Sequence, residues 1–475
     1  MADALPAGLG GWPVHAAGPE LLADLELVLS GARLSLDGDI RVVGADRDGD
    51  RSGDGATSTG VPVAMARVAE IGEDVRKAGH LVFADPEGTP IAVLALAPGT
   101  PESGRWVGLL RPLRAPAHGP FRALQRSPAQ VRAELPVGPV LALVCDRPLL
   151  NPDLVRLSAA ATSTGGAALL LVPTAGPQDS GMPPEFLVRA VLAAARTLRA
   201  RPTVVTVPLR RPADPRSAAL LHSELAACYG ATHLLGSAPP SGGPLPEVAV
   251  TVDPGTPSWP DVVEMLGGEA PLPPSVAPAD VLTELRRWRP PPSRRGLVVF
   301  FTGLSGSGKS TLARALADAL VEDGHRTVTM LDGDVVRRML SAGLGFSRAD
   351  RDLNVRRIGW VAAEVARHGG VAVCAPIAPY DATRRSVRRD VEAVGDFILV
   401  HVSTPLEVCE RRDRKGLYAR ARAGLIPSFT GVSDPYEAPT DADLVLDTSA
   451  ESPDAGLGRL LDLLRRDGRL PGRRD

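Results

Sequence analysis

A glycine-rich segment at residues 303–311 combines the residue types that bind phosphate groups. It reads GLSGSGKST, directly follows the apolar run 297–301, and matches the pattern GxxxxGK[ST] in full. Glycines let successive amide N–H groups face phosphate oxygens, and the positive end of the following helix, expected over 309–321, faces the same anion. We expect ATP to bind here, with Lys309 at the β- and γ-phosphates and the Ser310 hydroxyl on Mg²⁺. The expected ATP-contacting residues are Gly303, Ser305, Gly306, Ser307, Gly308, Lys309, Ser310 and Thr311. A glycine-rich turn that binds nothing is the alternative.

Two carboxylates stand at the end of the next expected strand. Asp332 and Asp334 follow the expected strand 327–331, and open α/β sheets bind ligands beyond the carboxyl ends of their strands. A carboxylate there can orient or deprotonate an acceptor hydroxyl, or hold the water shell of a metal. The alternative is that both aspartates cap a helix over 335–340. Several arginines follow, and a subset of them would bind an anionic acceptor through forked hydrogen bonds.

Length and composition indicate a protein of several domains. The chain has 475 residues, of which 44% are apolar and 23% charged, and a net charge of −2. Because neither half is a polycation, we expect no general nucleic-acid or membrane binding. Without a targeting pattern or a run of 18 apolar residues, we expect a cytoplasmic protein. The four cysteines lack the spacing of a zinc site or a disulfide framework.

The elements that must position these residues fall into three expected domains. Residues 1–114 contain β-type runs at 81–83 and 91–96 around a turn at 85–88, which predicts a small β-rich domain. In the second expected domain, residues 115–290, the segment 139–238 alternates apolar runs with helical patterns, which predicts a parallel α/β sheet. The proline-rich joint 290–296 precedes the phosphate-loop domain, residues 291–475, for which we also expect a parallel sheet. The predicted fold class is therefore α/β.

The motifs of the last third closely resemble those of adenylyl-sulfate kinase. They are GLSGSGKST (303–311), LDGD (331–334), GFS (345–347), NVRRI (354–358), RDRKGLYARARAG (412–424) and FTG (429–431). The resemblance covers about 296–450. It implies transfer of the γ-phosphoryl group of MgATP to the 3'-hydroxyl of adenosine 5'-phosphosulfate (APS), giving 3'-phosphoadenosine 5'-phosphosulfate (PAPS) and ADP. It implies Asp334 as the carboxylate near the acceptor hydroxyl, with Asp332 and Lys309 also catalytic. The APS-binding residues that it implies are Arg337, Phe346, Arg351, Asn354, Ile377, Lys415 and Phe429.

Two positions depart from the family pattern. Where family members commonly have a serine before a proline, this chain has Ala378 before Pro379. An alanine cannot carry a phosphoryl group, so the consistent mechanism is direct transfer between two bound substrates. The usual DGDN is here DGDV, with Val335 in place of the asparagine. We expect activity to survive both changes.

Residues 18–290 more weakly resemble ATP sulfurylase, and the order of the two parts matches fused sulfurylase–kinase proteins. The expected PUA-like β-rich domain and the α/β domain would then be its two parts. The sulfurylase QxRNxxHxxH run is replaced by CDRPLLNP (145–152), without a histidine, and a GRDHAG-type motif by GSAPPSG (236–242). Sulfate adenylylation would lose its electrostatic support, so we expect a degenerate and inactive module.

The sequence is also compatible with three other functions. The first is a bifunctional PAPS synthase whose divergent sulfurylase half works. The second is a regulatory protein that senses APS or PAPS without turnover. The third is a kinase for another hydroxyl acceptor. We also expect a homo-oligomer, and an association with a separate ATP sulfurylase is possible from the resemblance.

Overall fold

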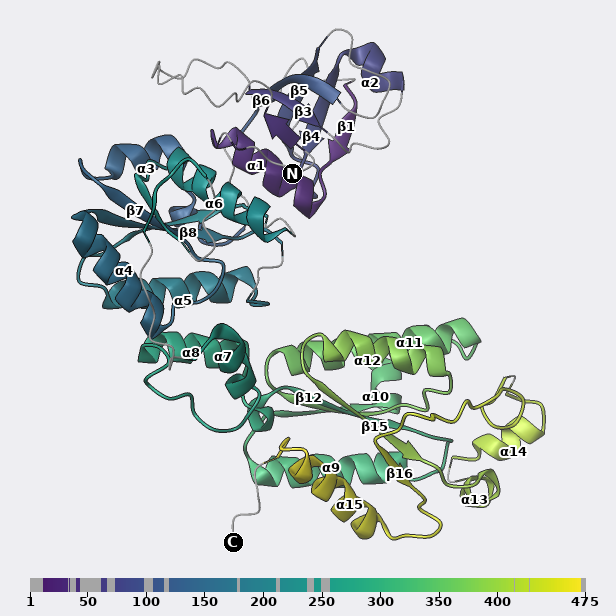
Figure 1. Ribbon diagram of the computed structural model, residues 1–475. Helices are drawn as coiled ribbons and strands as arrows, with labels where there is room; N and C mark the ends of the chain where they lie inside the picture. The colour runs from purple at the N-terminus through teal and green to yellow at the C-terminus, as the bar shows by residue number, and fades with distance from the viewer. Residues whose placement is uncertain are drawn as a thin grey trace. The chain divides into compact units, whose positions relative to one another are not determined.

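The computed structural model describes residues 12–32, 34, 40–42, 61–65, 73–97, 106–114, 119–176, 180–210, 214–236, 243–248, 257–413, 415–426 and 428–470. The chain divides into two compact units (Figure 1). Unit 1 comprises Met1–Glu264 and Leu272–Trp288, and unit 2 comprises Met265–Pro271 and Arg289–Asp475. Over the ranges just given, every helix is too short or too polar to cross a lipid bilayer.

Unit 1 begins with a six-stranded sheet. Its strand order is β1 (Val14–Ala16), β4 (His80–Ala84), β5 (Pro90–Leu96), β6 (Trp106–Pro112), β3 (Val61–Met65) and β2 (Ile40–Val42). Strands β4 and β5 pair antiparallel, which confirms the two β-type runs expected from the sequence. Helices α1 (Pro19–Leu29) and α2 (Glu73–Ala78) accompany this sheet, and Leu25 and Phe83 are fully buried.

The second part of unit 1 is a parallel five-stranded sheet, as the alternating pattern predicted. Its order is β11 (Glu247–Val248), β10 (His233–Leu235), β7 (Val140–Val144), β8 (Ala167–Pro173) and β9 (Thr203–Val207). Its helices are α3 (Pro128–Glu134), α4 (Asn151–Thr164), α5 (Pro184–Thr197) and α6 (Pro215–Cys228). Two further helices, α7 (Trp259–Leu266) and α8 (Ala279–Trp288), follow along the chain.

Unit 2 is built on a second parallel sheet with helices on both faces (Figure 1). Its strand order is β13 (Val328–Asp332), β14 (Val371–Ala375), β12 (Leu297–Thr302), β15 (Asp396–Val402) and β16 (Leu444–Leu446). Helices α9 (Lys309–Asp323) and α15 (Pro453–Arg466) pack on one face. Helices α11 (Arg348–Arg367) and α12 (Asp381–Glu392) pack on the other.

The central strand β12 explains why the sequence is apolar throughout this run. Its residues alternate between the two cores, with Leu297, Val299 and Phe301 on the α9 side and Val298 and Phe300 on the α11 side. All five side chains are fully buried. A parallel strand that is covered on both faces needs a continuous apolar sequence, and its carboxyl end is thereby fixed at the edge where the phosphate loop begins.

Two helices of unit 2 begin at positions that bear on the site. Helix α11 begins at Arg348, because the Ser347 hydroxyl accepts a hydrogen bond from the amide of Asp350 and caps the first turn. Helix α10 spans Gly333–Met339 instead of 335–340. Asp332 therefore ends strand β13, and Asp334 lies in the first turn of the helix.

Candidate active site

The phosphate loop has a backbone that requires its glycines. Gly303, Gly306 and Gly308 have positive φ angles of +148°, +78° and +96°. A Cβ on Gly303 would lie 2.4 Å from the carbonyl oxygen of Val402, closer than real contacts allow. These positions let the chain turn tightly between β12 and α9, so that the loop opens toward the positive end of a 15-residue helix.

Lys309 is a buried cation in this loop. Its side chain is 6% exposed, and its Nζ donates to the Leu304 carbonyl at 2.6 Å and lies 3.4 Å from Ser307 Oγ. Burial lowers the pKa of Lys309 to about 8; the Cys409 thiol opposes this shift and the charge of Lys415 adds to it. A buried ammonium whose hydrogen-bond acceptors are neutral is stabilised by an anion. The loop is therefore electrostatically suited to a phosphate group.

Several hydroxyl groups donate hydrogen bonds to carbonyl oxygens of the loop. The Ser307 carbonyl accepts hydrogen bonds from Thr404 Oγ1 at 3.1 Å and from Thr448 Oγ1 at 2.9 Å. Arg412, at the end of α13 (Leu406–Arg412), donates to Thr448, and the hydroxyl of Tyr418, in α14 (Leu417–Arg422), donates to the Ser305 carbonyl at 2.9 Å. The sequence reasoning missed both threonines, which are distant along the chain. The RDRKGLY motif contained the signal for Arg412 and Tyr418.

Of the two carboxylates of the LDGD motif, only that of Asp332 is among the described side chains. Asp332 is 8% exposed at the end of β13, and its Oδ2 lies 3.7 Å from Arg314 Nη2. The backbone of Asp334 is in α10, but its side chain falls outside the described part of the structure. Its role therefore stays a prediction.

The Ser310 hydroxyl lies in the first turn of α9, and the residue is exposed. Within the described residues, no group of three or more His, Cys, Asp or Glu side chains could hold a metal ion. One hydroxyl beside a phosphate loop still fits Mg²⁺, since this ion usually takes most of its ligands from water and from substrate phosphates.

Arg351 and Asn354, which share the buried face of α11, reach the interior in different ways. Arg351 Nη1 donates to Asp434 Oδ2 at 2.6 Å and to Thr430 Oγ1 at 2.8 Å. The hydroxyl of Tyr380 donates to the same Asp434 oxygen at 2.7 Å, and burial followed by this carboxylate raises the pKa of Tyr380. Asn354 Oδ1 is buried and lacks a hydrogen-bond partner among the described residues. An orphan acceptor of this kind calls for an explanation, and a bound ligand is one.

The structure distributes the other expected acceptor residues over several contacts. The Arg337 guanidinium lies 4.4 Å over the ring of Phe346 and donates to the Gly345 carbonyl. Phe429 is 8% exposed and packs edge-on against Tyr418, with ring centroids 5.0 Å apart. Lys415 is exposed at the start of the segment that leads into α14.

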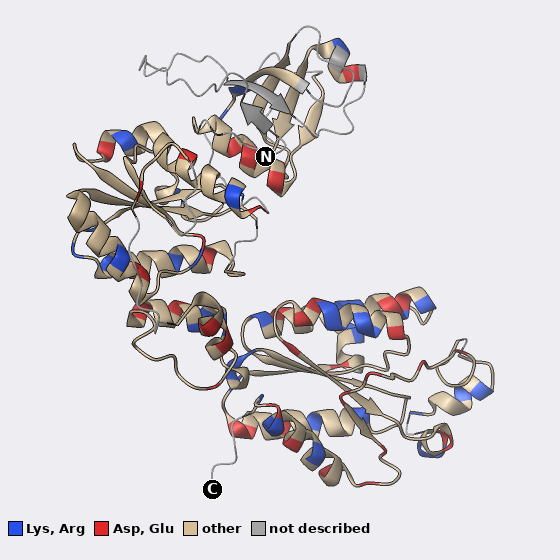
Figure 2. Cartoon of the chain, viewed as in Figure 1, with Lys and Arg blue, Asp and Glu red and all other residues tan. Residues whose placement is uncertain are grey.

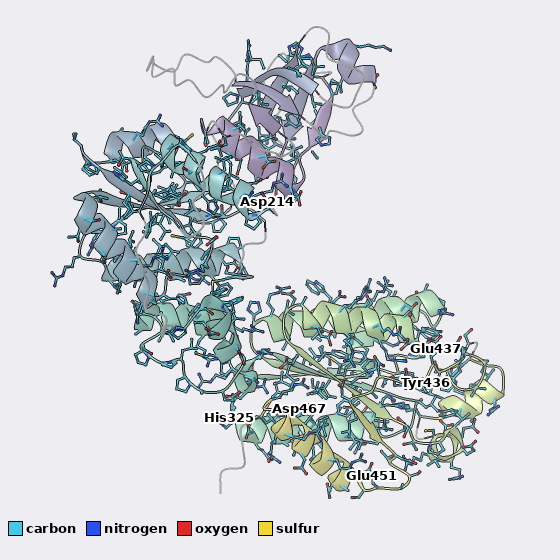
Figure 3. The ribbon with its side chains drawn as sticks, in the orientation of Figure 1. Asp214, His325, Tyr436, Glu437, Glu451 and Asp467 are labelled. Carbon is cyan, nitrogen blue, oxygen red and sulfur yellow. The ribbon has the colours of Figure 1, made fainter. Side chains whose placement is uncertain are left out.

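Ile377 is half-buried, and its carbonyl accepts from the Thr302 hydroxyl and from the Gly303 amide. Ala378, one of the two departures from the family pattern, has a φ of +46° and is buried. Tyr436 and Glu437, which are labelled in Figure 3, lie further along the chain. The Glu437 amide donates to the Pro379 carbonyl.

The corresponding edge of the parallel sheet in unit 1 carries cations that are already paired. Arg147 follows β7 and makes two hydrogen bonds to the Asp153 carboxylate, at 2.6 and 2.9 Å. Arg210 follows β9 and makes two hydrogen bonds to Asp24, at 3.1 and 2.7 Å, and a third to Glu20. Residues 237–242, which replace the second sulfurylase motif, lie outside the described residues. Figure 2 shows both signs of charge on both units.

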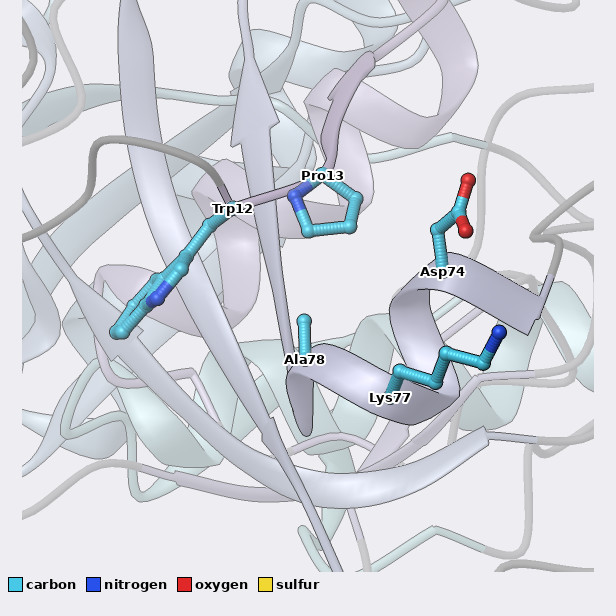
Figure 4. Close-up of a pocket in the computed structure, with 5 residues that line it drawn as sticks. All are labelled: Trp12, Pro13, Asp74, Lys77 and Ala78. Atoms are coloured by element: carbon cyan, nitrogen blue, oxygen red, sulfur yellow. The ribbon is translucent and has the colours of Figure 1, made fainter.

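A depression of about 610 Å³ in unit 1 is lined by Trp12, Pro13, Asp74, Lys77 and Ala78 (Figure 4). Its lining includes one carboxylate and one ammonium but no glycine-rich loop. The residues at which the sequence places chemistry all belong to other parts of the chain. We therefore assign the candidate active site to the phosphate loop of unit 2.

The region that contains this loop is similar to known proteins. The family model for adenylylsulphate kinase matches residues 295–447. Two proteins named sulfate adenylyltransferase, from Phaeosphaeria nodorum and Emericella nidulans, are 49% and 48% identical to this chain over 191 and 190 residues. Each match covers 40% of this chain and 33% of the relative, so the chain spans about a third of the length of these curated relatives.

A solved structure resembles nearly the whole chain. The hexameric APS kinase from Thiobacillus denitrificans is 29% identical, with a TM-score of 0.75, over 98% of this chain and 95% of its own. The likeness therefore extends over both units, beyond the segment that the family model matches. Residues 295–447 of the chain form a domain of the adenylylsulphate kinase family.

Proposed function

We propose that this protein is an adenylyl-sulfate kinase that acts in sulfate activation. It transfers the γ-phosphoryl group of MgATP to the 3'-hydroxyl of APS and releases PAPS and ADP. The observation that carries the proposal is the complete phosphate loop with its buried Lys309, set in a domain of the adenylylsulphate kinase family. The likeness of nearly the whole chain to the APS kinase from Thiobacillus denitrificans supports the same acceptor.

The proposed reaction is a direct in-line transfer. The bond between the 3'-oxygen and the γ-phosphorus forms as the bond to the β–γ bridging oxygen breaks, and the hydroxyl proton passes to the Asp334 carboxylate. Lys309 and the loop amides stabilise the phosphate charge, while Ser310 would hold Mg²⁺, which neutralises the β- and γ-oxygens. Asp332 would support this arrangement from the end of β13. Ala378 has no hydroxyl, so a phosphorylated residue at this position is excluded.

The acceptor side of the site would be built on α11 and on the segment 428–437. The orphan oxygen of Asn354 and the guanidinium of Arg351 are buried on one face of α11. APS would accept a hydrogen bond from Arg351, which also donates to Asp434. Phe429 would supply an apolar surface for the adenine of APS. Arg337 with Phe346, Ile377 and Lys415 would complete the pocket.

We propose that unit 1 does not make APS. Its sheet edge has no histidine in 145–152, and its two arginines are held by carboxylates. An incoming sulfate or phosphate would have to displace Asp153 or Asp24, and hydrogen bonds to charged groups contribute about 1.5–3 kcal/mol each. Unit 1 would then serve assembly, and the hexameric state named for the Thiobacillus denitrificans protein favours a homo-oligomer.

A second candidate function is a bifunctional PAPS synthase, favoured by the curated relatives named sulfate adenylyltransferase. Pyrophosphate-dependent ATP formation from APS separates the two. We expect none from the purified full chain, and formation of ATP at a rate above that of heat-treated protein would establish the bifunctional enzyme instead.

The kinase itself is tested by ADP release from the full chain with and without APS. We expect release to require APS, and Asp334→Asn to lower kcat about 100-fold or more, as removal of a general base does. Asp318→Asn, an exposed aspartate on α9, is the matched control and should act as the parent. ADP release that ignores APS, or an Asp334→Asn variant as fast as the parent, would overturn the proposal. Acceptor competition would expose a different substrate hydroxyl, and absence of turnover would favour a sensor.

A further inference from the structure

The hydroxyl of Thr302 lies where three segments of unit 2 meet. Thr302 ends strand β12, directly before Gly303, and is fully buried. Its Oγ1 lies 2.7 Å from the Ile377 carbonyl oxygen and 3.0 Å from the hydroxyl oxygen of Tyr436. The Gly303 amide donates to the same Ile377 carbonyl at 3.3 Å. The start of the phosphate loop is therefore joined to the segment that carries Ile377 and to the one that carries Tyr436.

The direction of these hydrogen bonds follows from the protons available. A hydroxyl donates one proton, and a carbonyl oxygen can only accept. The two carbonyls next to Thr302 Oγ1 are those of Ile377, at 2.7 Å, and Ala378, at 3.2 Å, so the threonine proton goes to a carbonyl. Tyr436 must then donate its own proton to Thr302. Burial raises the pKa of Tyr436, against the opposing effect of Thr302, so the phenol keeps this proton at neutral pH.

A second brace holds the same segments without Thr302. The buried Arg384 donates to the Ala378 carbonyl at 2.8 Å and to the Glu437 carbonyl at 2.7 Å. The Asp381 amide also donates to Glu437 Oε2 at 2.7 Å. Loss of the Thr302 hydroxyl should therefore leave the fold intact. It should allow the Ile377 carbonyl to shift slightly relative to Gly303.

We propose that Thr302 is a positioning residue for phosphoryl transfer. Its hydroxyl fixes the acceptor pocket at Ile377 against the donor loop at Gly303, so that the two substrates meet at the right separation. This inference rests on the proposed kinase activity. Small displacements of reacting groups are costly, since a misplacement of about 1 Å can reduce the rate about 100-fold. The residue acts through Ile377 and Tyr436, without touching either substrate.

Isosteric variants of the full chain test the proposal. Thr302→Val keeps the shape and removes the hydroxyl, whereas Thr302→Ser keeps the hydroxyl. We expect Thr302→Val to lower kcat about tenfold or more, with the KM for ATP within twofold of the parent and the thermal midpoint nearly unchanged. Thr302→Ser should restore most of kcat. The matched control is Thr206→Val in β9, a buried threonine whose hydroxyl lacks a partner within the described ranges; its kcat should equal that of the parent.

Tyr436→Phe tests the other end of the hydrogen bond. We expect a smaller fall in kcat than for Thr302→Val. The double variant Thr302→Val/Tyr436→Phe should have a kcat no lower than that of Thr302→Val alone, because both changes break the same hydrogen bond between Thr302 and Tyr436. A parent-like kcat in Thr302→Val would overturn the proposal. So would a loss that Thr302→Ser fails to rescue, or one that tracks a fall in thermal midpoint, because either marks a structural role. Failure of the parent to turn over APS would instead remove the proposed function itself.

Discussion

Each of the two parallel sheets of the chain has a cation at the carboxyl ends of its strands, and the two cations differ in their hydrogen-bond partners. In unit 2, strand β12 runs into a loop where Lys309 is buried against the neutral oxygens of Leu304 and Ser307. In unit 1, strand β7 is followed by Arg147, which Asp153 already holds through two hydrogen bonds. The same architecture therefore carries a cation that can bind an anion in unit 2, and a cation already paired with a carboxylate in unit 1. Binding capacity follows from how the charges are paired, and the sheet alone does not decide it.

Removing the two cations should have the most unequal effects. We expect Lys309→Met to lower kcat for APS-dependent ADP release about 100- to 1000-fold, because a preorganised donor to the transferred phosphate is lost. Arg147→Met should leave kcat within twofold of the parent, because the guanidinium serves Asp153. Steady-state kinetics on both full-length variants checks this, and equal losses would erase the contrast between the units.

The two cations should also differ in how stability depends on pH. The native pKa of Lys309 is about 8, below its ordinary value of 10.5, so the unfolded chain binds this proton more tightly. The unfolding free energy should therefore rise between pH 8 and 10.5, by up to about 3 kcal/mol. Calorimetric comparison of the parent with Lys309→Met isolates this contribution, and a difference that is flat or falls with pH would contradict it.

For Arg147, burial acts to lower the pKa, but the hydrogen bonds and charge of Asp153 outweigh it and raise the pKa above its usual value. The guanidinium stays charged over the same window. Arg147→Met should therefore show no comparable pH dependence relative to the parent.

Two glycines with positive φ sharpen the comparison further. At Gly303 an added Cβ would meet the Val402 carbonyl, whereas at Gly165, which ends α4 with a φ of +60°, the space is open. Gly165→Ala should cost about 1–2 kcal/mol of stability from the left-handed backbone alone, with kcat unchanged. Gly303→Ala should cost more and also lower kcat at least tenfold, since the loop must shift. Equal thermal midpoints and rates for the two variants would refute the difference.

The last variant concerns the paired arginine. Asp153→Ala removes both hydrogen bonds to Arg147 and the one from the Leu150 amide. Because the Arg147 side chain is 34% exposed and can rehydrate, we expect a stability loss of about 1–3 kcal/mol. Urea unfolding measures this loss, and kinase kcat should stay at the parent value. A tenfold fall in kcat would show that the units are coupled.

The sequence predicted the elements of the site better than their side-chain partners. The strand, loop and helix at 297–321 are visible locally, because glycine spacing and an apolar run determine them. The pairing of Arg351 with Asp434 is not, since 83 residues separate the two along the chain. Thr302 could have been noticed as the one polar residue that ends an otherwise apolar strand, but its contact with Tyr436 depends on how distant segments pack.

Ala378 has an implication for engineering this protein. Its side chain is 1% exposed, and its backbone adopts a left-handed conformation held by Arg384. A serine introduced there would have its oxygen enclosed by protein, sealed away from any phosphate donor. Ala378→Ser would therefore add a hydroxyl without adding a covalent step.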